Sequence, residues 1–209
     1  MVFGHGTKMV VCTAVAILLL RGRAMGQTIT DLSNGVLTAN IPFGNLTPGT
    51  TTTPSSAQVL FKIRSSNING YRVRASATFS ATENSPVDGG STISASDIGI
   101  GVTFLSNGAS VQTPRIERVA TGFNYNPATV TAVNGLTPYT GMASGRATLA
   151  DVIANPNMTI LSGPRISNNP SPTHPTNFIT VTITFGLVGQ FFTPSTLSGV
   201  VTLTIVDGP

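Results

Sequence analysis

Side chains that could carry out nucleophilic, acid–base or metal chemistry are few in this chain. It has one cysteine, Cys12, and two histidines, of which His174 stands in a Pro-Thr-His-Pro stretch typical of an exposed loop. Catalytic triads and zinc sites need several such side chains together, so the composition disfavours both. Seven carboxylates remain, and no pair of them lies in a motif typical of a glycosidase: Asp31, Glu83, Asp88, Asp97, Glu117, Asp151 and Asp207. We therefore expect a protein that is not an enzyme and that holds no cofactor and no metal.

Four basic residues form the most concentrated charge in the sequence: Lys62, Arg64, Arg72 and Arg74. The alternation within residues 57–80 predicts a hairpin that places all four on its outer face. Such a face could bind an anionic polymer, for example an acidic polysaccharide, lipid headgroups or nucleic acid. The alternative is a solvated face that discourages edge-to-edge aggregation, and the sequence favours this second interpretation.

Glycines and aromatic residues offer little to a small ligand. Gly99-Ile100-Gly101 lacks the third glycine and the following helix of a phosphate-binding loop, so we expect a bulge or a close backbone approach there. The chain has no tryptophan, and its three tyrosines fall at inward or turn positions: Tyr71, Tyr125 and Tyr139. Sugars and bases stack on exposed rings, so we expect no small-molecule substrate and no specific nucleic acid.

The most regular pattern lies in the last thirty or so residues. Apolar residues alternate with threonine in 178–187 and again in 200–205, with a turn expected at 193–195. Side chains of a strand point alternately to opposite faces, so each run has an apolar face and a hydroxyl face. The two runs predict half of an antiparallel sheet with one buried side.

Other segments repeat this alternation at short spacing. Strands are expected in 36–43, 57–64, 71–80, 98–104, 119–125 and 158–161, with a short edge strand at 130–133, whereas 147–153 fits a helical turn or a strand equally well. Only 9% of the residues are charged, against roughly 25% in an average soluble domain. About eight or nine short strands without long helices predict an all-β fold, an antiparallel β-sandwich.

The N-terminus has the pattern of a secretory signal peptide. Lys8 precedes the apolar run 9–20, which would span about 18 Å as a helix and is too short for a bilayer core of roughly 30 Å. We expect cleavage before Gln27, although Arg21 and Arg23 leave an uncleaved anchor open. Lys8, Arg21 and Arg23 are three of the 11 basic residues, so a mature chain would carry eight cations against seven carboxylates. The high isoelectric point is then poor evidence for a nucleic-acid partner.

These patterns divide the chain into four parts. We expect a signal peptide at 1–26, an N-terminal strand or arm at 27–44, a Thr/Pro linker or loop at 45–56 and a β-sandwich domain at 57–209. Export would place the protein in the periplasm, at the cell surface or outside the cell.

Two stretches resemble secreted bacterial fibre and coat subunits. They are Phe43-Gly44-Asn45-Leu46-Thr47-Pro48-Gly49 and Ser198-Gly199-Val200-Val201-Thr202-Leu203-Thr204-Ile205, which look like the ends of spore coat protein U-like and pilin-like domains. Those families usually hold a cysteine pair, and this chain does not. The resemblance implies an Ig-like or pilin-like sandwich whose subunits exchange strands.

The expected function follows from this resemblance and from the architecture. We expect a structural or surface-assembly protein, a fibre, coat or matrix subunit, whose partners are copies of itself or other surface subunits. The exchangeable strand would be formed by Val36, Leu37, Ala39, Ile41 and Phe43, because an edge strand offers unpaired backbone groups. The alternative is a secreted module that binds a polymer or carbohydrate, which requires an exposed aromatic or basic groove.

Overall fold

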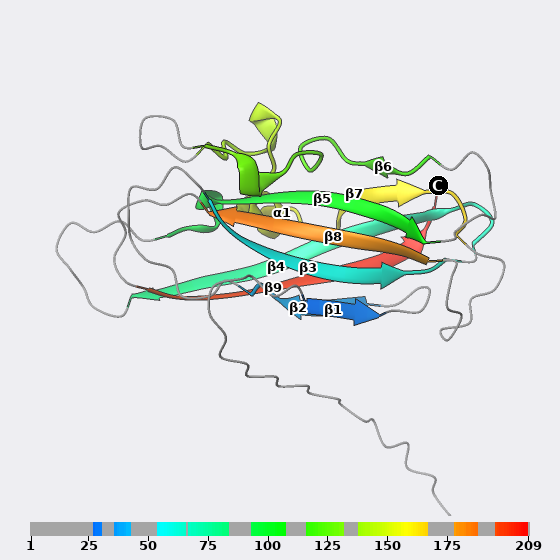
Figure 1. Ribbon diagram of the computed structural model, residues 1–209, viewed down its shortest axis with the longest axis horizontal. Coiled ribbons are helices and arrows are strands. Elements are labelled where there is room, and N and C mark those ends of the chain that lie inside the picture. The colour runs from blue at the N-terminus through cyan, green and yellow to red at the C-terminus, as the bar shows by residue number, and fades with distance from the viewer. Residues whose placement is uncertain are drawn as a thin grey trace, which may run out of the picture.

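The chain folds into two facing β-sheets (Figure 1). The computed structural model describes residues 27–30, 36–42, 54–65, 67–83, 93–107, 116–131, 138–166, 178–187 and 195–208. The four-stranded sheet has the order β1 (Gln27–Thr30), β3 (Ser55–Ile63), β8 (Phe178–Leu187) and β5 (Ile98–Asn107). The five-stranded sheet has the order β2 (Val36–Asn40), β9 (Ser195–Asp207), β4 (Tyr71–Glu83), β7 (Met158–Gly163) and β6 (Arg118–Val119). The prediction of an all-β, sandwich-like fold with antiparallel sheets is confirmed, apart from β1 and β3, which pair in parallel.

The core lies between the two sheets and is built from the alternating apolar residues. Every second side chain of β8 is fully buried, as are the inward side chains of its neighbour β3 and of β4 in the opposite sheet: Ile179, Val181, Ile183, Phe185, Val59, Phe61, Ile63, Tyr71, Val73 and Ala75. Val201, Leu203 and Ile205 on β9 complete the opposite layer. Each of the valine, leucine, isoleucine and phenylalanine side chains stabilises the fold by about 1.5–3 kcal/mol through burial. The inward positions predicted for these strands are confirmed.

The predicted strand partners were wrong in two places. Residues 57–80 do not form a hairpin, because β3 pairs with β8 while β4 pairs with β9 and β7 in the other sheet. Strands β8 and β9 likewise lie in different sheets. The alternation of apolar residues predicts which face of a strand is buried. It does not predict the strand's partner, because two consecutive strands show the same burial pattern whether they form a hairpin or lie in opposite sheets.

The stretch predicted as a strand at 119–125 is mostly irregular. Strand β6 ends at Val119, and tight turns follow up to a 3₁₀ turn, η2 (Pro127–Thr129). Val130 and Thr131 are not in a strand, and the rest of the edge strand expected at 130–133 lies outside the described residues. A second 3₁₀ turn, η3 (Met142–Ser144), precedes the helix α1 (Leu149–Ala154), and a third, η1 (Ala95–Asp97), leads into β5.

The helix α1 settles the choice between helix and strand at 147–153. Thr148 is its N-cap, and its hydroxyl accepts a hydrogen bond from the Asp151 backbone N–H. The Asp151 carboxylate in return accepts from the Thr148 N–H at 2.7 Å. This capping box starts a helix that the apolar pattern alone does not distinguish from a strand. Leu149 and Val152 bury its inner side against the sandwich.

Several predicted features lie outside the described residues. They are the signal segment 1–26, most of the linker 45–56, the turn at 193 and 194, Phe43 and His174. In the described part of the chain, no helix has the length and apolar character needed to cross a membrane.

Candidate functional site

The N-terminal segment supplies one edge strand of each sheet. Strand β1 lies beside β3, and β2 lies beside β9 in the other sheet, so residues 27–30 and 36–40 form the two edges on one side of the sandwich. The two strands also approach each other (Figure 1). Strands β1 and β2 therefore cover edges of β3 and β9 that would otherwise expose unpaired backbone groups.

Strand β2 is held by its inner side chains. Leu37, Ala39 and Ile41 of the predicted assembly strand are 7%, 3% and 8% exposed, whereas Val36 is 66% exposed. The Ile41 N–H donates a 2.8 Å hydrogen bond to the Gly199 carbonyl oxygen. A β-carbon on Gly199 would lie 2.8 Å from Cδ1 of Ile41, so the glycine leaves room for that side chain. The predicted inward alternation of this strand is confirmed for the described residues.

The four cations predicted on one hairpin face do not share a face. Lys62 lies on β3 and Arg64 just beyond it, whereas Arg72 and Arg74 lie on β4 in the other sheet. Lys62 Nζ and Arg64 Cζ lie 5.1 and 5.6 Å from the centre of the Phe178 ring, and Arg64 is only 5% exposed. These two cations pack on an aromatic ring. The predicted arrangement was wrong because it depended on the hairpin.

Glycines leave part of the outer face of the four-stranded sheet without side chains. Gly99 and Gly101 on β5 lie beside Gly186 and Thr184 on β8. A β-carbon on Gly99 would lie 2.6 Å from the Tyr125 hydroxyl, and one on Gly101 would lie 2.7 Å from Cδ of Pro127. The irregular segment, residues 120–131 and 138–148, therefore rests directly on the sheet backbone. This confirms the close approach predicted at Gly99-Ile100-Gly101.

Two tyrosines link parts of this segment that are distant in the sequence. Tyr139, only 2% exposed, donates a 2.7 Å hydrogen bond to the Pro127 carbonyl oxygen. Tyr125 donates one of 2.7 Å to the Ala147 carbonyl oxygen, and the two rings lie 6.4 Å apart. Burial raises the pKa of both phenols above the ordinary tyrosine value, so both remain neutral donors.

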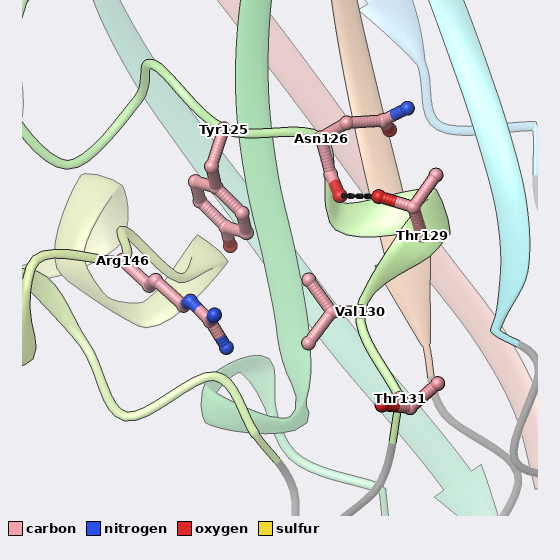
Figure 2. A pocket seen from close by; sticks show the side chains of 6 residues that line it. All are labelled: Tyr125, Asn126, Thr129, Val130, Thr131 and Arg146. Carbon is pink, nitrogen blue, oxygen red and sulfur yellow. Dashed lines mark hydrogen bonds between the residues drawn. The ribbon is translucent and has the colours of Figure 1, made fainter.

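A pocket of about 350 Å³ opens beside Tyr125 (Figure 2). Its lining residues are Tyr125, Asn126, Thr129, Val130, Thr131 and Arg146. The Arg146 guanidinium lies 5.9 Å from the centre of the Tyr125 ring and donates a long hydrogen bond of 3.4 Å to the Pro138 carbonyl oxygen. The lining thus offers one cation, an aromatic ring, hydroxyl groups and an amide.

The sequence reasoning missed this pocket. Tyr125, Val130 and Thr131 come from two stretches predicted as strands, and Tyr125 was expected at an inward or turn position. The signal that could have located it is the run of glycines in β5, because strand glycines mark places where backbone or ligand approaches. Within the described residues, no three histidine, cysteine or acidic side chains gather closely enough to hold a metal ion.

Comparisons of the chain with models of protein families, with curated proteins and with solved structures give no match.

Proposed function

We propose that the chain is an exported structural subunit that assembles with copies of itself or with other surface proteins, and that it is not an enzyme. The observation that carries the proposal is that residues 27–42 provide an edge strand to both sheets. In the proposed assembly, β1 and β2 of one copy occupy the β3 and β9 edges of the next. Backbone pairing supplies the affinity and the inward side chains supply the register.

The inner side of β2 supports this role. Leu37 and Ala39 enter the core between the sheets, and Ile41 fits the space left by Gly199. These contacts are independent of which copy supplies the strand. In this proposal residues 1–26 are a secretory signal peptide, the Thr/Pro stretch 45–56 is the tether of the arm, and the sandwich is of the Ig-like or pilin-like type.

A pair of cysteines tests the exchange directly. Thr38 on β2 lies opposite Thr202 on β9, and their hydroxyl oxygens are 3.3 Å apart. Directly paired residues of antiparallel strands have Cα atoms about 4.5–5.5 Å apart, within the range that a disulfide spans. We expect the double variant Thr38→Cys/Thr202→Cys to give a ladder of disulfide-linked multimers on a non-reducing gel. Monomers with a closed internal disulfide would contradict exchange.

Deletion of residues 27–44 gives a second test of assembly. The secreted material would be compared by light scattering and electron microscopy with that of a Thr38→Ala control. We expect polymers from the control and a soluble, unassembled body from the deletion. Polymers that persist without the arm would contradict the proposal.

A second candidate function is binding of a polymer or carbohydrate. The observation that favours it is the pocket beside Tyr125, in which Arg146 and an aromatic ring meet.

A further inference from the structure

The walls of the pocket beside Tyr125 are held in place before any ligand arrives. The Val102 and Ile100 N–H groups on the edge of β5 donate to the Phe123 and Ala147 carbonyl oxygens, at 2.8 and 3.0 Å. Tyr125 and Tyr139 add the two hydrogen bonds described above. The irregular segment is therefore anchored on both sides of the pocket. A preformed site loses little conformational entropy when a ligand binds.

Arg146 is the charged group of the pocket. Its side chain is exposed, and it forms no ion pair with any residue that the structure describes. The bond to the Pro138 carbonyl oxygen uses one of the five N–H donors of a guanidinium. The planar guanidinium matches a carboxylate through two parallel hydrogen bonds. Arg146 thus suits an anionic ligand, and a carboxylate is an anion that it can pair with.

The remaining polar groups suit hydroxyl groups. The Asn126 side-chain oxygen accepts from the Ala128 N–H, which leaves its NH₂ group as a donor. The Thr129 hydroxyl donates to the Asn126 carbonyl oxygen, which leaves its oxygen as an acceptor. Thr131 adds a further hydroxyl. The lining thus provides both donors and acceptors, as the hydroxyl groups of a sugar require.

Val130 and Tyr125 decide how a ring would lie. Figure 2 shows Tyr125 and Arg146 on one side of the pocket and Val130 and Thr131 on the other. The guanidinium lies over the Tyr125 ring, so that face of the ring is not open to a ligand. We therefore expect a ligand to be held by the charge of Arg146 and not by stacking on Tyr125. Val130 offers an apolar contact for the C–H face of a ring. A volume of about 350 Å³ is at the low end for ligand pockets, so it suits one or two sugar rings.

We infer that this pocket binds a hexuronate, a sugar unit that carries a carboxylate, at the end of or within an acidic saccharide. The carboxylate pairs with Arg146, the ring hydroxyls meet Asn126, Thr129 and Thr131, and the ring packs on Val130. This binding is independent of the arm-mediated assembly, because β1 lies at the opposite edge of the four-stranded sheet from β5 and β2 lies in the other sheet.

Calorimetric titration of the full chain with glucuronate and galacturonate tests the inference. Glucose is the neutral control, and acetate supplies a carboxylate without a ring. We expect saturable binding of at least one uronate, at least about tenfold tighter than glucose or acetate, and weaker binding as salt is raised. No saturable binding of either uronate up to about 10 mM, where a site of millimolar affinity would be largely occupied, would overturn it. Equal affinity for glucose would also overturn it.

Variants assign the binding to this pocket. Arg146→Gln should weaken uronate binding by about tenfold or more, and Arg146→Lys by less, because lysine keeps the charge and loses the planar fork. Arg74→Gln, on the outer face of the other sheet, is the matched control and should bind as the unaltered chain does. Because Arg146 is exposed, its variants should unfold at the same denaturant concentration. Unaltered affinity in Arg146→Gln, or an equal loss in Arg74→Gln, would overturn the assignment.

Discussion

The Tyr139 hydroxyl donates a 2.7 Å hydrogen bond to the Pro127 carbonyl oxygen, directly above Gly186. A β-carbon on Gly186 would lie 2.7 Å from that hydroxyl and would also meet the Pro127 backbone. This hydrogen bond can therefore form in this position only because residue 186 has no side chain. The irregular segment can lie on the sheet only where the sheet has no side chain.

Gly186→Ala should destabilise the protein by about 1–3 kcal/mol, since the obstruction is backbone that cannot rotate away. Chemical denaturation measures the loss. Thr103→Ala, at an exposed position on the neighbouring strand β5, is the control and should change the free energy of unfolding by less than about 0.5 kcal/mol. Equal midpoints for the two variants would show that the segment does not rest on Gly186.

Stability should fall as the pH rises above 10, the ordinary pKa of tyrosine. Burial raises the pKa of Tyr139 and Tyr125 in the folded state, so both phenols stay neutral there while they ionise in the unfolded chain. The unfolded state then binds fewer protons, and unfolding becomes easier with each increment of pH. The stability that the two neutral phenols contribute is fully present below pH 10. It is lost as the pH rises toward the pKa values of these phenols in the folded state.

Urea midpoints at about pH 9 and about pH 11, on either side of the ordinary tyrosine pKa, measure this effect. Tyr139→Phe should show a smaller drop between the two pH values than the unaltered chain. At neutral pH the same variant should lose about 1–2 kcal/mol, because the buried Pro127 carbonyl oxygen loses its donor. An identical pH dependence in both proteins would contradict the burial of this phenol.

Leu37→Ala should loosen β2 without unfolding the sandwich. The side chain is 7% exposed, so its truncation should cost about 2–3 kcal/mol of the free energy that holds the strand on β9. Hydrogen exchange should accelerate in the amides of β2 and stay slow in β8. Thr38→Ala, which removes only an exposed hydroxyl contact with Thr202, should leave both rates unchanged. Slow exchange in β2 of Leu37→Ala would mean that backbone pairing alone holds the strand.

Thr148→Val should cost about 1 kcal/mol, the usual contribution of an N-cap. Valine keeps the shape of threonine, but it removes the hydroxyl that bonds both Asp151 groups. Thermal unfolding measures the loss, and Ser144→Ala, at an exposed position of η3, is the control. The backbone bridge between Thr148 and Gly99 does not involve the hydroxyl, so the variant should keep it. A midpoint equal to that of the control would exclude the capping role.

Much of the fold was predictable because a two-residue period states which face of a strand is buried. The alternation in β8, β9, β4 and β3 predicted the inward side chains, which the structure buries. The pairing partners were not predictable in the same way. A crossing between sheets and a hairpin leave the same burial pattern along each strand, so residues 57–80 were assigned to one hairpin that does not exist.

Of the two candidate sites, the strand β2 could be predicted from local sequence and the pocket could not. The inward register of Leu37, Ala39 and Ile41 is local, and it was predicted for this reason. The pocket joins Arg146 to Tyr125 and Val130, which approach only when the segment folds back over the glycines of β5 and β8. Likewise Lys62 and Arg64 contact the Phe178 ring only because β3 pairs with β8, since Phe178 is more than a hundred residues further along the chain.

The amino-acid sequence by itself determined the two-faced strands, the low charge and the scarcity of catalytic side chains, since period and composition are local properties of the chain. Tertiary structure alone decided which strand lies beside which, that both sheets take an edge from residues 27–42, and that a pocket forms over the glycines. These depend on contacts between distant residues, and the free energy of such contacts is set by the packing of the whole sandwich.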